Sequence, residues 1–184
     1  MSAFVLQLAD FTPTGEKAYE FPITREWLAE ALEDTEYGAP PEGAAPGVLE
    51  VTGREMGDDV LTDGRIQATL RVPCARCNED IDWPIDLPFA QLFVPRGSYE
   101  EQHSEEEVEL TPQDLERETY VGDSIALDAL VRENLILEVP MTPRCPEGCS
   151  NQEIAAYLDK GEEEKKPGPL AGLLDLKDKI GESS

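Results

Sequence analysis

Residues 65–89 read RIQATLRVPCARCNEDIDWPIDLPF, and this stretch decides the fold class. In its first half, polar residues alternate with apolar ones, as in a half-buried strand: Ile66, Ala68, Leu70 and Val72. In its second half, apolar residues recur at strict period two: Ile81, Trp83, Ile85, Leu87 and Phe89. The sequence therefore predicts two antiparallel strands joined by a turn that carries Cys74 and Cys77.

The flanks of this hairpin carry turn and edge signals. Pro84 and Pro88 fall on the opposite register of the second strand, which favours an edge or bent strand because proline lacks a backbone donor. Before the hairpin, Asp63-Gly64 is a strong turn dipeptide. It predicts a turn between Val60-Leu61 and the strand that begins at Ile66.

Outside the hairpin, the patterns alternate between strand and helix. Phe4, Leu6 and Leu8 predict a half-buried strand. Thr24 offers an N-cap to a short helix whose inward face is Trp27, Leu28, Ala31 and Leu32. Residues 37–47 predict a loop, and residues 128–137 predict a second helix. We therefore expect an α+β fold of mainly antiparallel strands with two or three short helices and a C-terminal helical tail.

Two segments are strongly charged. Residues 96–120 hold nine Asp and Glu against two Arg, which predicts a solvated loop or a docking surface for a basic partner. The final segment, 159–184, contains five of the six lysines and a charged linker before a short amphipathic helix. We predict one domain over 1–158 and an appended tail over 159–184.

The apolar stripe of the tail is a candidate partner-binding site. Its members recur at helical spacing: Leu170, Leu173, Leu176 and Ile180. A helix this short is marginal alone in water, so the stripe should dock either on the protein's own core or on a partner. We favour the partner.

The overall charge limits the classes of function. The chain has 184 residues, with 40 Asp and Glu against 15 Lys and Arg, and a formal net charge of −25. Clamping a phosphate backbone needs clustered Lys and Arg, so a main surface of that kind is not expected. No apolar stretch approaches the roughly 18 residues of a membrane span, and the N-terminus lacks the basic start of a signal peptide. We expect a soluble, cytoplasmic protein without a small-molecule substrate.

The four cysteines are the one group of residues whose spacing indicates a metal-binding or reactive site. Cys74 and Cys77 form one close pair, Cys145 and Cys149 another, and 67 residues separate the pairs. Where thiols stay reduced, such pairs are more often metal ligands than disulfides. Four thiolates would complete a closed tetrahedral zinc site, structural rather than catalytic; iron would also accept them. Unligated buried thiols, a redox dithiol at Cys74 and Cys77, and a structural disulfide remain alternatives.

No second catalytic constellation accompanies the cysteines. The single histidine, His103, lies in the acidic segment and is expected to be solvated. A Ser-His-Asp or Cys-His pairing would need another histidine, and no Gly-rich phosphate loop follows a strand. We do not expect an enzyme.

Four stretches together resemble a known family. They are residues 70–77, LRVPCARC; 125–140, IALDALVRENLILEVP; 141–145, MTPRC; and 167–177, PGPLAGLLDLK. Their order and spacing, from about Gly47 onward, resemble the YceD family of large ribosomal RNA subunit accumulation proteins. The resemblance implies a non-enzymatic role in the accumulation or maturation of large-subunit (23S) ribosomal RNA.

The chain also departs from that family. Many relatives continue past the second pair with further Cys and Gly residues, whereas here residues 150–153 read SNQE. Other relatives lack some of these cysteines, which implies that a metal is not essential to the family's role.

Charge and resemblance together predict an acidic adaptor that binds a basic ribosomal protein or an assembly intermediate of the large subunit. The alternative is direct contact with precursor ribosomal RNA. Its candidate residues are the lysines of the tail and three arginines on or beside the hairpin: Arg65, Arg71 and Arg76.

Overall fold

The structure is a computed structural model that describes residues 2–11, 15–97 and 117–149. Its main element is a five-stranded sheet in the order β2-β3-β4-β5-β6. The strands are β2 (Glu16–Ile23), β3 (Gly47–Met56), β4 (Asp59–Pro73), β5 (Asp80–Pro95) and β6 (Arg117–Tyr120). Neighbouring strands from β2 to β5 are antiparallel, and β6 joins β5 in parallel. The predicted α+β class with mainly antiparallel strands is confirmed.

The hairpin of β4 and β5 has the predicted strands and the predicted alternation of apolar side chains. Val72 lies opposite Ile81 and Ala68 lies opposite Ile85, so the two apolar rows share one face of the sheet. Ile66, Leu70 and Val72 on this face are completely buried. The alternation placed the two predicted apolar rows on the same side of the sheet, because side chains in a strand alternate between faces.

The predicted turn at Asp63-Gly64 is wrong. Both residues lie inside β4, and the chain turns instead at Gly57-Asp58, where Gly57 has a φ of +77°. A Cβ on Gly64 would lie 2.9 Å from the Cα of Val51 and 3.0 Å from the ring of Phe89. The glycine therefore permits a close approach of neighbouring strands, which is the other common use of glycine within a strand.

The proline-containing half of β5 is an edge, as predicted. β6 pairs with residues Leu92–Pro95 of β5, so among the described residues the part of the strand that holds Pro84 and Pro88 pairs with β4 alone. The backbone nitrogen of each proline, which carries no hydrogen to donate, can therefore face away from β4. β6 itself corrects the predicted loop over 96–120, because its residues 117–120 form a strand.

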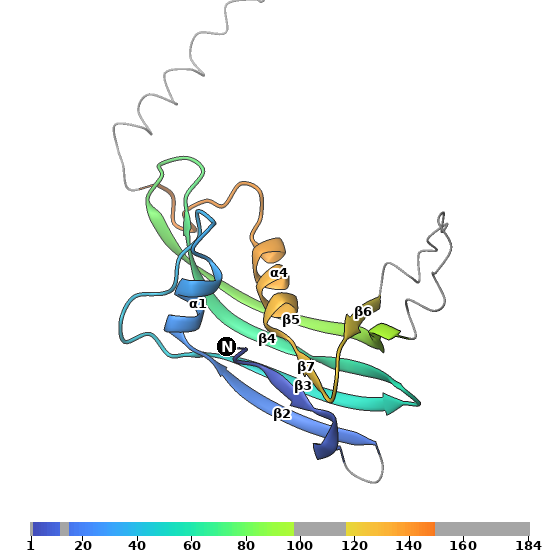
Figure 1. Cartoon of the computed structure of the whole chain (residues 1–184). Coiled ribbons are helices and arrows are strands. Elements are labelled where there is room, and N and C mark those ends of the chain that lie inside the picture. Colours follow the sequence, from blue (N-terminus) through green and yellow to red (C-terminus); the bar gives the residue numbers. More distant parts are fainter. Residues whose placement is uncertain (1, 12–14, 98–116, 150–184) are drawn as a thin grey trace, which may run out of the picture.

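One face of the large sheet carries the other elements (Figure 1). These are the helices α1 (Arg25–Ala31) and α4 (Asp128–Glu138), and a small sheet of β1 (Val5–Gln7) with β7 (Ser124–Ala126). Between them lies the core, whose largest fully buried side chains include Phe4, Leu6, Ile23, Leu28, Leu49, Phe93, Leu127 and Leu135. The predicted strand through Leu8 ends at Gln7, and a 3₁₀ turn, η1 (Leu8–Asp10), follows it.

Polar contacts position the two helices. The Thr24 hydroxyl accepts a hydrogen bond from the Trp27 amide at 3.3 Å, so the predicted N-cap of α1 is confirmed. The Asp128 carboxylate at the start of α4 accepts bonds from the Ala3 amide at 2.8 Å and from Trp27 Nε1 at 3.0 Å. Asp128 thereby ties the N-terminal segment and both helices together.

Candidate metal centre

The first cysteine pair lies in the turn between β4 and β5, as predicted. The turn is closed by main-chain hydrogen bonds from the Cys74 amide to the Glu79 carbonyl at 2.9 Å and from the Asn78 amide to the Cys74 carbonyl at 2.8 Å. Asn78 has a φ of +58°, a left-handed conformation that asparagine tolerates better than most residues. This tight geometry leaves both cysteines of the turn buried.

The second pair lies in the segment after α4. The helix ends at Glu138, and Pro140 and Pro143 follow, since proline cannot continue a helix. A turn then links the two cysteines: the Gly148 amide donates to the Cys145 carbonyl at 3.2 Å, and Gly148 has a φ of +91°. Pro146 in the second position of this turn suits the fixed φ of proline.

One main-chain hydrogen bond joins the two cysteine segments. The Ala75 amide, between the cysteines of the first pair, donates to the Pro143 carbonyl at 2.8 Å. The sequence carries no signal for this contact, because Ala75 and Pro143 lie far apart in the chain. The bond places the second pair beside the turn.

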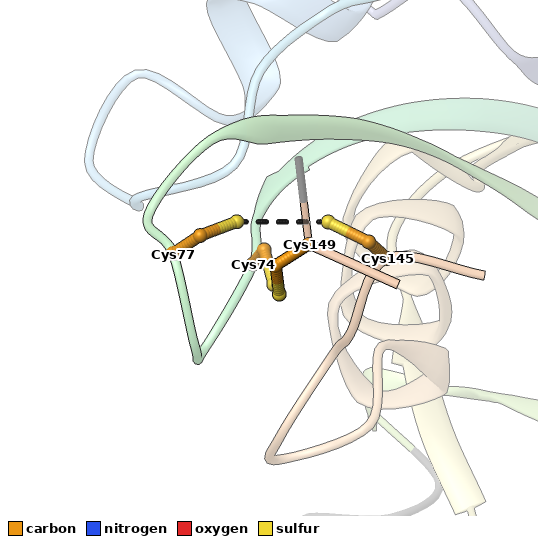
Figure 2. A group of neighbouring side chains, drawn as sticks. All are labelled: Cys74, Cys77, Cys145 and Cys149. Atoms are coloured by element: carbon orange, nitrogen blue, oxygen red, sulfur yellow. Dashed lines mark hydrogen bonds between the residues drawn. The ribbon is translucent and has the colours of Figure 1, made fainter. Parts of the chain in front are cut away.

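The four sulfur atoms converge (Figure 2). All lie within 4.8 Å of one another, with Cys74 Sγ 3.9 Å from Cys149 Sγ and Cys77 Sγ 3.6 Å from Cys145 Sγ. A disulfide would need about 2.05 Å, and the four cysteines are free. Around a zinc ion with bonds of about 2.3 Å, tetrahedral geometry places sulfur atoms about 3.8 Å apart. The donor set and its spacing therefore fit a tetrahedral thiolate site.

Of the cysteines in the cluster, Cys74 is favoured to lose its proton first. Hydrogen bonds from the backbone amides of Cys77 and Arg76 lower the pKa of Cys74 to about 6. The pKa of Cys145 is raised to about 12, chiefly because its thiol donates a hydrogen bond to Cys74 and because it is desolvated. Burial also raises the pKa of Cys149. Four adjacent thiolates would repel one another without a cation, so a metal is the natural partner of the full set.

The candidate RNA-binding arginines lie along β4 and its turn, and two of them contact carboxylates of β5. Arg65 binds both oxygens of Asp86, with Nη2 2.8 Å from Oδ2. Arg71 Nε lies 3.7 Å from Asp82 Oδ1. Arg76 is exposed in the cysteine turn. The carboxylates offset the charges of Arg65 and Arg71 on this exposed face of the sheet.

Several candidate residues lie outside the described part of the chain. They are His103, most of the acidic segment (98–116) and the tail residues Leu170, Leu173, Leu176 and Ile180. Among the helices that are described, none is long and apolar enough to cross a membrane.

The fold and the cysteine cluster define the class: a small α+β protein with four cysteines gathered where a hairpin turn of the sheet meets the segment after α4. The chain belongs to the YceD family, since the family model for the large ribosomal RNA subunit accumulation protein YceD matches residues 62–177. This match covers more than half of the chain and includes both cysteine pairs and α4. The family's name points to a role in the accumulation of large-subunit ribosomal RNA. Comparison with curated proteins found no match, and comparison with solved structures found none.

Proposed function

We propose that this protein is a non-enzymatic factor of ribosome biogenesis in the cytoplasm that supports accumulation of large-subunit ribosomal RNA as an acidic adaptor. It would bind a basic ribosomal protein or an assembly intermediate that carries one. The family match over residues 62–177 carries this proposal. The net charge of −25 supports a basic protein, rather than RNA, as the direct partner, because like charges repel and opposite charges steer association.

We assign the cysteine cluster a structural role within this function. Zinc held by Cys74, Cys77, Cys145 and Cys149 would have four protein ligands and no open position for water. It would hold the turn of the sheet to the segment after α4. The metal would therefore stabilise the surface that partners meet, without supplying chemistry to them.

The domain boundaries and the tail belong to the same proposal. Residues 1–158 would form the folded unit, and residues 159–184 would form a charged linker with an amphipathic helix. In that helix the partner-binding side chains would be the apolar stripe: Leu170, Leu173, Leu176 and Ile180. Each such side chain contributes roughly 1.5–3 kcal/mol when buried, which is enough to offset the ordering of one short helix.

Direct RNA contact is the alternative function. It would rely on Arg65, Arg71 and Arg76, but Asp86 and Asp82 offset the first two. RNA phosphates would have to displace these carboxylates from the arginines, and this displacement would offset part of the attraction between arginine and phosphate. The ion pairs therefore favour the protein-binding adaptor.

Two measurements test the function. In a strain without the gene, the ratio of mature large-subunit to small-subunit ribosomal RNA should fall; an unchanged ratio under cold and normal growth would refute the role. Affinity capture at low salt should then recover a basic ribosomal or assembly protein after nuclease treatment. Recovery of RNA alone, lost on substitution of the three arginines, would establish the alternative instead.

A further inference from the structure

The two helices flank a groove of about 660 Å³ on the helical side of the molecule. The small side chains of Ala31 and Ala129 leave the space open, and carboxylates line most of the rest. Glu30 and Glu33 are both exposed there. The groove is thus a concave, negatively charged surface on the described part of the chain.

One end of the groove already contacts a positively charged side chain of the protein itself, that of Arg132. Arg132 of α4 donates from Nε to the Ala31 carbonyl and from Nη2 to Asp34 Oδ1, each at 2.6 Å. The last turn of α1 holds no basic residue, and Glu30, Glu33 and Asp34 instead lie at or just beyond the C-terminal end of the helix. Acidic residues at this end oppose the helix dipole and lower helix stability. Such a local conflict is expected where a surface serves binding.

Trp27 supplies an aromatic wall to the same groove. Its indole donates to Asp128 Oδ1 at 3.0 Å, and its ring centroid lies 4.7 Å from that of Phe4. These two contacts hold the ring in one orientation. A fixed tryptophan face next to carboxylates is suited to a lysine or arginine side chain through cation–π attraction.

We propose that this groove binds a lysine- and arginine-rich segment of a protein partner. The inference rests on the adaptor function proposed above and names the surface that performs it. Its basis is charge complementarity: carboxylates from α1, from the turn after it and from the start of α4 line one hollow together with the side chain of Trp27. The same carboxylates repel the phosphates of RNA.

The two tryptophans of the chain allow a direct test. In the full-length Trp83→Phe variant, Trp27 is the only tryptophan. Addition of a short lysine-rich peptide at low salt should change its emission, whereas a glutamate-rich peptide of equal length should not. Anisotropy of the labelled lysine-rich peptide with the unsubstituted chain gives the affinity independently of any tryptophan replacement.

Two double variants of equal net charge distinguish binding in the groove from attraction by the overall negative charge of the protein. Glu30→Gln with Glu33→Gln removes two charges at the groove; Glu20→Gln with Glu50→Gln removes two from exposed positions that face each other across β2 and β3. Both double variants have the same net charge. The groove variant should weaken peptide binding about tenfold at low salt, and the sheet variant by less than about twofold, since partly exposed ion pairs each contribute modestly.

Three results would overturn the proposal. Equal losses in the two double variants would mean that only net charge attracts the peptide. A change in Trp27 emission of the free Trp83→Phe protein when residues 159–184 are deleted would show that the chain's own tail occupies the groove. Binding of a uridine oligonucleotide with the same variant sensitivity would assign the groove to RNA. A failed peptide assay would leave the gene-deletion test of the function intact, so the two failures are distinguishable.

Discussion

Metal removal, or replacement of Cys145 by serine, should destabilise the whole protein. A metal bound by both Cys77 and Cys145 would link residues 68 positions apart in the chain. On the chain-entropy model, closing such a loop restricts the unfolded state by about 4 kcal/mol. This is a large share of the roughly 5–15 kcal/mol that stabilises a typical domain. At about 2–4 °C per kcal/mol for a chain of this size, the expected fall in melting temperature is about 8–16 °C.

The measurement is thermal unfolding of the full chain as purified, after treatment with a chelator, and as the Cys145→Ser variant. Elemental analysis of protein purified without added metal should find close to one zinc per chain. Arg144→Ser is the matched control, because Arg144 is the exposed neighbour of Cys145 in the same segment. Its unfolding curve should coincide with that of the unsubstituted protein. A metal-free protein with four titratable thiols and an unchanged curve would refute the site.

Three further perturbations test the core, a titrating carboxyl and the tail. Leu135 is completely buried and Leu137 is 82% exposed on the same helix, so Leu135→Ala should lower the free energy of unfolding by about 2–5 kcal/mol and Leu137→Ala should barely change it. Burial, and secondarily the charge of Glu133, raise the pKa of Glu118. A carboxyl with a raised folded-state pKa adds stability at low pH and loses it as the pH rises through that pKa. Glu118→Gln should therefore raise the free energy of unfolding at neutral pH. Below the pKa of an unfolded glutamate, about 4.3, urea unfolding should give the variant and the unsubstituted protein the same stability. Deletion of residues 167–184 should leave the melting temperature nearly unchanged and abolish ribosomal RNA accumulation; a fall of many degrees would place the tail in the protein's own core.

The sequence by itself determined the central hairpin and the location of the first cysteine pair. Period-two alternation is a local property, since adjacent side chains of any strand point to opposite faces. Ile66 and Ile85 could therefore be assigned to one buried face before the structure was known. The cap at Thr24 and the helix over 128–137 were also predictable, because capping and helical periodicity depend on residues within a few positions.

Tertiary contacts decided what the local signals left open. Asp63-Gly64 carries a turn signature, yet Gly64 lies within β4 because neighbouring strands pack closely against it. From the sequence alone, Arg65 is a basic residue with no evident acidic partner, but the register of β5 places Asp86 within hydrogen-bonding distance of it. Local patterns do not contain such cross-strand partners, which depend on register and packing.

The cysteine site shows the same division. The spacing of each pair was visible in the chain, and four thiols in two close pairs suggested one tetrahedral set. Only the fold brings them together, through the length of β5, the packing of α4 and the hydrogen bond from Ala75 to Pro143. The groove between α1 and α4 had no signal in the sequence, because its two walls lie far apart in the chain: Arg132 of α4 and Ala31 of α1, which contact each other, are 101 positions apart. Side chains that far apart become neighbours only when the core orders both helices on one face of the sheet.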